Sequence, residues 1–219
     1  MKKLLISFCL MSVISLTFAQ STTFGVRGGV NFANLLLHTS NSDNILLYNL
    51  PGSLTTFSVG AFVDFKFGNF SLQPSINYTV KGDNEKMALG GDSSFTKNWH
   101  LNYLEIPVDL AYHIKIAIGN IYIGAGPYIA FGLTGKVKAG FGSNSSSVDA
   151  KFGGNNMFKS TDIGLNGIAG LQLKNGFLFH LNYDLGLSNI LNATYDNANA
   201  NDNNSVKTRT FGLSVGYAF

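Results

Sequence analysis

Three scarcities in the sequence each exclude a class of protein. A single Cys excludes a disulfide-stabilised scaffold and a thiolate metal site. Only 12% of the residues are charged, about half the usual share, which excludes a disordered or solvated acidic chain. No run reaches the roughly 18 consecutive apolar residues that a membrane-spanning helix needs. Glycine and aromatic residues are abundant instead, with 25 Gly, 18 Phe and 9 Tyr, and this composition favours a β-rich protein over a helical bundle.

The chain also lacks a basic face for nucleic acid. Its formal net charge is +3, and Lys2 and Lys3 supply two of those positive charges. Without them the acidic and basic residues nearly balance, whereas nucleic-acid binding needs clustered Lys and Arg. We therefore expect no nucleic-acid partner.

The N-terminus has the pattern of an export signal. Lys2 and Lys3 precede an apolar run from Leu4 to Leu16, and small residues follow up to Ala19. A membrane-anchoring helix is the alternative, but the run is shorter than a span requires. We predict a cleaved signal peptide over residues 1–19 and one domain over residues 20–219, without Cys and without disulfides.

Hydrophobic residues alternate with polar or small ones through most of the remaining chain, as they do in half-buried strands. Three pairs of such runs flank the tight turns Gly68-Asn69, Gly119-Asn120 and Lys174-Asn175-Gly176. One further run lies at each end of the domain. The eight expected strands are residues 23–35, 57–67, 70–80, 104–114, 121–131, 163–173, 177–187 and 206–219.

The connections alternate between short and long. The long ones are expected at residues 36–54, 82–100, 134–160 and 189–205, all at the same end of an up-and-down sheet. Strands of this length with short turns at one rim and long loops at the other are typical of a transmembrane β-barrel. We predict an all-β, eight-stranded antiparallel up-and-down barrel with short periplasmic turns and long extracellular loops.

A soluble barrel with its apolar face inward is the main alternative. An eight-stranded barrel has an interior just wide enough for side chains to fill it, so it cannot hold all the Phe, Tyr, Leu, Ile and Val of this sequence. The opposite face is polar or small and includes Gly60, Gly124 and Gly170, which suit a crowded interior. The apolar face is therefore expected to face lipid.

Several segments resemble one family. They are Phe24–Asn31, Asn102–Val108 with its Tyr-Leu-Glu-Ile-Pro run, Gly124–Tyr128, Tyr183–Ile190 and Gly212–Phe219. Together they are similar to the PorT-like outer-membrane β-barrel proteins of Bacteroidota-type Gram-negative bacteria, over nearly the whole mature chain. The resemblance implies location in the cell outer membrane. It also implies that Phe219 is a signal for the outer-membrane assembly machinery. For most members it implies no defined activity, although some are linked to protein secretion.

The polar side chains of the interior are the candidate site. The expected network is Arg27, Asp64, Gln73, Asn77, Lys81, Glu105, Asp109, His180 and Asp184. Counting along the strands predicts two ion pairs, Arg27 with Asp64 and Lys81 with Glu105. The network is either a hydrogen-bonded plug or a charge-lined conduit. We favour the plug, because eight strands leave no open channel.

Catalytic and metal-binding patterns are weak. The segment His38-Thr39-Ser40, with Asp43 nearby, holds the only close His and Ser, in a loop where such a spacing arises by chance. No cluster has zinc spacing, and the Asn-rich segment 192–205 lacks the Gly and terminal Glu of a calcium loop. We expect no enzyme activity, no metal and no cofactor.

The long loops carry the remaining signals. The Gly- and Ser-rich segment 140–156 is expected to be mobile, and the apolar residues 45–51 to form a lid over the barrel mouth or a partner contact. Aromatic residues predict two girdles at the membrane surfaces. The outer girdle would contain Tyr48, Tyr78, Trp99 and Tyr103, and the inner one Phe67, Phe70, Tyr112, Phe177 and Phe219.

Three functional classes remain open. The favoured one is a structural or surface-interaction barrel whose loops contact a protein partner outside the cell. The second is an accessory component of protein secretion or envelope assembly. The third is a small-solute pore or a lipid-modifying enzyme. Outer-membrane lipid is an expected partner in each case.

Overall fold

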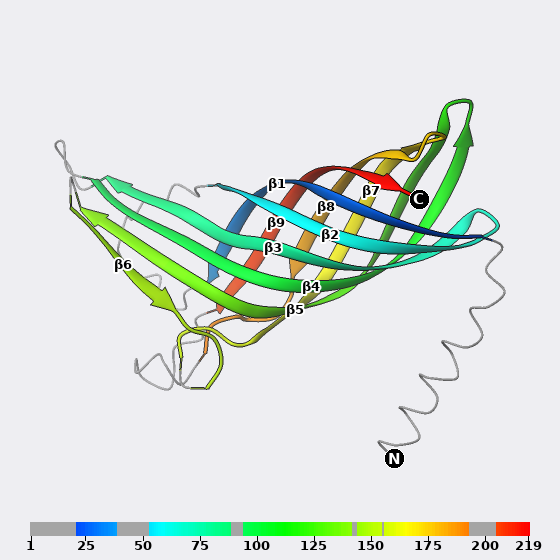
Figure 1. Ribbon diagram of the computed structural model, residues 1–219. Coiled ribbons are helices and arrows are strands. Elements are labelled where there is room, and N and C mark those ends of the chain that lie inside the picture. The colour runs from blue at the N-terminus through cyan, green and yellow to red at the C-terminus, as the bar shows by residue number, and fades with distance from the viewer. Residues whose placement is uncertain (1–20, 39–52, 89–93, 142–143, 155, 193–204) are drawn as a thin grey trace, which may run out of the picture.

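The computed structural model describes residues 21–38, 53–88, 94–141, 144–154, 156–192 and 205–219, and nine strands lie in these ranges (Figure 1). The strands are β1 (Ser21–His38), β2 (Leu54–Phe67), β3 (Phe70–Ala88), β4 (Ser94–Ile116), β5 (Gly119–Phe141), β6 (Asn144–Ala150), β7 (Thr161–Leu173), β8 (Phe177–Gly186) and β9 (Ser205–Ala218). No helix within these ranges is long and apolar enough to cross a membrane.

Eight of the described strands close into a ring in the order β1, β2, β3, β4, β5, β7, β8, β9, and β9 pairs back to β1. Every neighbouring pair is antiparallel. The predicted eight-stranded up-and-down barrel is therefore confirmed. Closure satisfies the backbone groups of every strand in the ring, which a protein in hydrocarbon requires because no water is available there.

The three tight turns form one rim of the barrel, here called the short-turn rim. Two turns fall where the sequence predicts them, with Gly68 at φ 67° and Gly176 at φ 92°, a backbone conformation that suits glycine. The third prediction is wrong by two residues. Ile116 pairs with Gly119, so the turn consists of Ala117 and Ile118. The apolar Ile118 concealed this turn, although its side chain is exposed at the tip.

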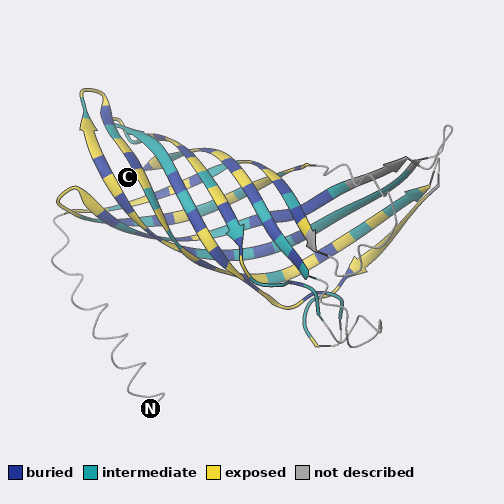
Figure 2. Ribbon diagram, turned by 180° about the vertical axis from the view of Figure 1, so that it is seen from behind, coloured by how far each residue is buried: buried dark blue, intermediate teal, exposed yellow. Residues whose placement is uncertain are grey.

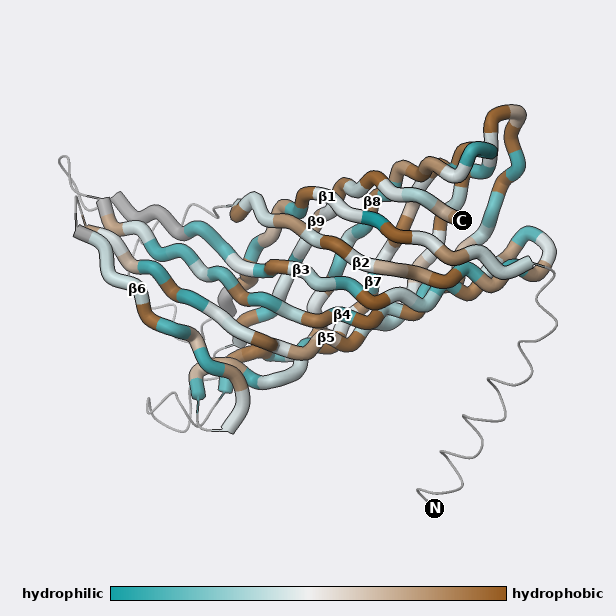
Figure 3. The backbone as a smooth tube through the Cα atoms, in the orientation of Figure 1, coloured by the Kyte–Doolittle hydropathy of each residue, from teal (hydrophilic) through white to brown (hydrophobic). Residues whose placement is uncertain are grey.

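Side chains alternate across the barrel wall as expected, in bands of exposed and buried residues (Figure 2). The outward face of the wall is apolar, and the hydrophobic bands are visible along the tube in Figure 3. On β4 the outward residues are apolar from Leu104 to Ile114. That stretch is about 33 Å long along the strand and about 23 Å high at a tilt near 45°. This height matches the apolar band of a membrane barrel, about 25 Å.

Beyond this band, parts of four strands continue as a projection, seen at the left of Figure 1. We call this projection, residues 82–88, 94–102, 134–141 and 144–150, the extended sheet. The loop predicted over residues 82–100 is therefore wrong for most of its length, because Gly82 to Ala88 pair with His100 to Ser94. In water both faces of a strand can be polar, so hydrophobic alternation is a poor guide there.

The predicted mobile segment 140–156 is also largely regular. Its Asn144–Ala150 portion is strand β6, which pairs with Phe141 to Gly135 of β5. The register of β4 and β5 shifts at Asn102 and Tyr103, leaving Leu133 as an extra residue. Such a bulge bends a strand and increases its twist, which accounts for the departure of the extended sheet from the barrel wall.

Several predictions lie outside the described residues. They are the signal peptide over residues 1–19, the lid over residues 45–51, Tyr48 of the outer girdle, and most of the Asn-rich segment 192–205.

Candidate functional site

The lumen is filled with polar side chains, as the sequence predicts. Arg27, Asp64, Gln73, Lys81, Glu105, Asp109, His180 and Asp184 are all buried inside the barrel, and Asn77 is half-buried. Within the described residues the buried charged groups comprise six carboxylates and only two cations, Arg27 and Lys81. The buried acidic side chains therefore outnumber the buried cations, and the stability of the interior depends on how these acidic groups are partnered.

Lys81 is the centre of the upper lumen. Its Nζ lies 2.7 Å from Glu105 Oε2 and 3.2 Å from Asp162 Oδ2, and its side chain is 0% exposed. The same ammonium sits 4.2 Å from the centre of the Tyr128 ring, a cation–π contact. The pair with Glu105 is the one the sequence predicts. One cation thus neutralises two carboxylates in a site that water does not reach.

Asp162 is a central member of the lumen cluster that the predicted network does not include. Besides Lys81, its carboxylate accepts hydrogen bonds from Tyr128 at 3.1 Å, Thr208 at 2.7 Å and Ser188 at 2.8 Å. These partners come from β5, β9 and the segment after β8. The alternation along this strand places Asp162 on the polar face that lines the lumen, but only the closed ring brings its partners together.

Arg27 does not form the predicted ion pair with Asp64. Its guanidinium donates to Ser75 Oγ at 3.0 Å and to Gln73 Oε1 at 3.4 Å, and it lies 3.4 Å from His180 Nδ1. The prediction is wrong because Asp64 is in register with Thr23, not with Arg27. Four residues of strand separate the two levels, about 13 Å. Counting from the short-turn rim overlooked the stagger between strands joined by a long loop.

Asp64 belongs to a lower cluster near the short-turn rim. Its Oδ2 lies 3.5 Å from Lys66 Nζ and 3.8 Å from His113 Nε2, and Ser71 Oγ lies 2.8 Å from the same Nε2. A catalytic triad needs the hydroxyl and the carboxylate on opposite nitrogens of the imidazole. Here both approach Nε2, and Ser71 is 0% exposed. The cluster therefore lacks the geometry of a nucleophilic site.

Amide and hydroxyl side chains fill the middle of the lumen. Asn166 donates to Asp109 at 3.0 Å, and Asn182 donates to Asp184 at 3.3 Å. Asn77 donates to Ser75 at 3.2 Å. The cavity between these groups has a volume of about 20 Å³, room for about one water molecule.

An apolar cluster closes the lumen at the long-loop end. Its buried members are Leu35, Leu101, Tyr103, Tyr128, Ala130, Ala150, Phe158, Ile190 and Val206. Phe158 comes from the segment between β6 and β7 and Ile190 from the segment after β8, so both connections fold into the mouth. Trp99 packs edge-on against Phe158 at 5.4 Å, and Tyr103 against Phe152 at 5.4 Å.

This apolar cap corrects part of the predicted outer girdle. Trp99 and Tyr103 pack within the mouth and do not face lipid, because both share the inward alternation of Glu105. Tyr78 does lie on the outside, 5.9 Å from Phe57. The inner girdle is exposed as predicted, with Phe67, Phe70, Tyr112, Phe177 and Phe219 all on the surface.

Glycines on the inner face make room for the large rings of the lumen. A Cβ at Gly164 would lie 2.6 Å from an atom of the Tyr128 ring, and one at Gly170 would overlap the Tyr122 ring. The hydroxyl of Tyr122 in turn lies 2.8 Å from His180 Nδ1. Small residues on one strand thus position aromatic side chains from the next.

Within the described residues no group of three or more His, Cys, Asp or Glu side chains is arranged to hold a metal ion. The segment His38-Thr39-Ser40 with Asp43 lies at the edge of the described residues or beyond them.

The comparison with protein-family models agrees with this architecture. A family model described as "Outer membrane protein beta-barrel domain" matches residues 18–192. No curated protein sequence gives a significant match. Among solved structures, the chain is similar to Ail, the attachment invasion locus protein of Yersinia pestis, with 15% identity, a TM-score of 0.42, and coverage of 91% of this chain and 100% of that one.

Two further solved structures are similar at the same level. The outer membrane protein OprG from Pseudomonas aeruginosa shows 13% identity and a TM-score of 0.46, over 91% of this chain and 96% of that one. The outer membrane enzyme PagL shows 12% identity and a TM-score of 0.37, over 90% of this chain and 99% of that one. Similarity at this level gives no information on activity.

Proposed function

The chain belongs to the outer membrane protein β-barrel domain family and lies in the cell outer membrane, and on that premise we propose that it is a sealed barrel that binds a partner outside the cell through its extended sheet. Barrels of this class place their short turns in the periplasm. The extended sheet then projects from the cell surface.

The size and exposure of the extended sheet are the observation that carries this proposal. On β4, Ser94 to Asn102 continue for about 30 Å past the outermost apolar residue of the outward face. Strand β6 is the last strand in the order of the sheet, so one of its edges pairs with no other strand of the described residues. On it, Val148 is 66% exposed. An ordered sheet edge can bind an extended segment of another protein through backbone hydrogen bonds.

The filled lumen supports a sealed barrel over a solute pore. Polar groups occupy its middle, and the apolar cap closes its long-loop end. Purified protein in planar bilayers is expected to give no steady single-channel current. A steady current would support the pore instead.

The finer assignments are part of the same proposal. The segments quoted above support a place among the PorT-like proteins, and with it a role in secretion or envelope assembly as the competing function. Phe219 is 76% exposed at the short-turn rim, beside Tyr217 at 5.2 Å. This position suits a C-terminal signal that the assembly machinery reads. The proposal includes no enzymatic activity.

Site-specific photo-crosslinking in intact cells tests the proposed function. One crosslinker replaces Val148 at the edge of β6, and a matched one replaces Ile118, which is 59% exposed in a turn of the opposite rim. A partner captured only from Val148 is expected. Capture only from Ile118 would indicate a periplasmic partner and favour the secretion role. Capture from neither position would contradict a protein partner at either rim.

A further inference from the structure

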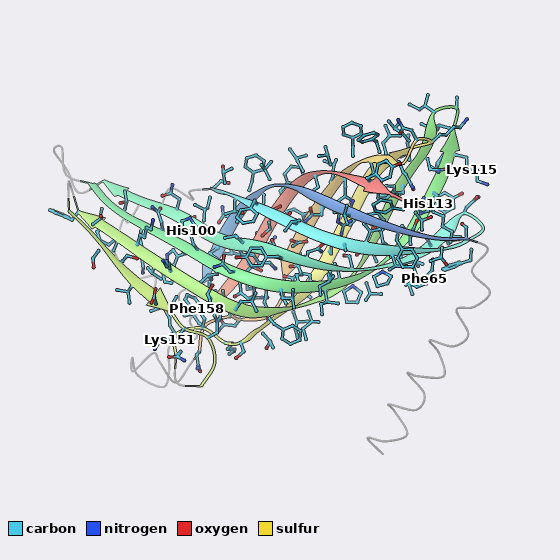
Figure 4. The ribbon with its side chains drawn as sticks, viewed as in Figure 1. Phe65, His100, His113, Lys115, Lys151 and Phe158 are labelled. Atoms are coloured by element: carbon cyan, nitrogen blue, oxygen red, sulfur yellow. The ribbon has the colours of Figure 1, made fainter. Side chains whose placement is uncertain are left out.

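A groove of about 1070 Å³ lies on the outside of the barrel wall, where the extended sheet begins. It runs across four adjacent strands, from β2 through β3 and β4 to β5, and reaches the segment that follows β6. His100 and Asn102 of β4 lie near its centre. Asn102 donates to Thr134 Oγ1 of β5 at 2.8 Å. In Figure 4, His100 and Lys151 lie at the end of the molecule opposite Lys115.

The two edges of the groove differ in chemistry. Phe57 and Leu133 are apolar and are 53% and 49% exposed. Lys136, Lys138 and Lys151 line the other part, and Asp149 supplies the one carboxylate among the described lining residues. The groove is therefore net positive, whereas the lumen on the other side of the wall is rich in carboxylates.

The groove lies at the upper boundary of the apolar band. Phe57 packs beside Tyr78, and Tyr78 is in register with Leu104, the last apolar outward residue of β4. Asn102, His100 and the lysines come next in the direction of the extended sheet. In a bilayer this boundary is the level at which acyl chains meet headgroups.

The lysines of the groove have no acidic partner among the described residues. None of the three lysines forms a salt bridge with another described residue. Burial and the nearby Lys138 lower the pKa of His100 below its ordinary value of 6.5, so the imidazole is neutral at pH 7. A neutral imidazole offers one donor and one acceptor.

We propose that this groove binds a phosphorylated glycolipid of the outer leaflet, with its phosphate on the lysines and its acyl chains beside Phe57 and Leu133. The sugar hydroxyls of such a lipid are the groups that His100 and Asn102 would hydrogen-bond. This site is separate from the edge of β6 that the proposed function invokes. Lipid binding at the groove and protein binding at Val148 can therefore succeed or fail independently.

Native mass spectrometry of the detergent-solubilised full-length protein, titrated with diphosphoryl lipid A, tests the proposal. The test variant is Lys136→Gln with Lys138→Gln, and the control is Lys115→Gln with Lys174→Gln, which removes two exposed lysines at the short-turn rim. Each lysine near an anionic lipid surface contributes about fivefold in affinity, so the test variant is expected to bind about thirtyfold more weakly. The control is expected to bind like the unchanged protein.

A second titration uses fully dephosphorylated lipid A. Binding of this lipid is expected to be weak for every variant, because the lysines then have no anion to contact. Equal binding of the two lipids, or equal losses in test and control variants, would overturn the proposal. The gel mobility of unheated protein, which distinguishes folded from unfolded barrels, establishes that both variants are folded before either is titrated.

Discussion

Replacing Lys81 by methionine measures how far one cation stabilises the lumen. Methionine keeps an apolar stem of similar length and removes the ammonium that lies 2.7 Å from Glu105 and 3.2 Å from Asp162. Both carboxylates would then be buried without a cation. Removing one partner of a buried ion pair costs about 3–5 kcal/mol. We expect a loss near the upper end of that range, because Lys81 serves two carboxylates and also stacks on Tyr128 at 4.2 Å.

Urea unfolding in detergent micelles, followed by fluorescence, gives the free energy of unfolding of each variant. The sole tryptophan, Trp99, packs on Phe158 in the apolar cap, so its emission reports the folded mouth of the barrel. Lys115→Met is the control, because Lys115 is exposed at the short-turn rim and its change is expected to stay within about 0.5 kcal/mol.

A triple variant separates charge from packing. Adding Glu105→Gln and Asp162→Asn to Lys81→Met removes both uncompensated charges and keeps groups that can hydrogen-bond. It is expected to recover most of the lost stability. A loss below about 1 kcal/mol in the single variant would refute the role given to Lys81. So would a triple variant no more stable than the single one.

Three further outcomes are expected. Gly170→Val is expected to lower the free energy of unfolding in urea by about 1–3 kcal/mol, because the valine side chain would overlap the Tyr122 ring in the lumen. An unchanged unfolding midpoint would show that this ring moves freely. Phe158→Ala is expected to lower the free energy of unfolding by about 3–5 kcal/mol and to shift the Trp99 emission to longer wavelength. An unshifted emission spectrum would place Trp99 outside the apolar cap. Lys138→Gln is expected to raise the pKa of His100 toward 6.5, because the variant loses a cation that repels the protonated imidazole. An unchanged NMR titration of His100 would contradict the closeness of His100 and Lys138.

The alternation of the sequence predicted the barrel because it reports a local property. Phe57 and Val59 face outward and Ser58 faces inward simply because successive side chains of a strand point to opposite sides. The volume of an eight-stranded interior then decides which face meets lipid. The turns at Gly68 and Gly176 are similarly local, since each needs a backbone conformation that glycine adopts readily.

The extended sheet escaped prediction because strands in water need no apolar face. Residues 82–88 and 94–100 are polar enough to suggest a loop, and their regularity comes from backbone pairing with each other. The groove depends on this sheet and on the bulge at Leu133. Neither could be located before the register of β4 and β5 was known.

The sequence by itself determined the class of the protein, the identity of its lipid-facing residues and the polar character of its lumen. These follow from residue type and from a period of two along each strand. Only the tertiary structure decided which charges meet. Counting residues from the short-turn rim puts Arg27 and Asp64 at the same level, but the stagger of their strands separates them by about 13 Å. Asp162, by contrast, meets Lys81, Tyr128 and Thr208, which come from three other strands. Contacts across a closed barrel are set by the register of every strand between them, and that register is a property of the whole ring.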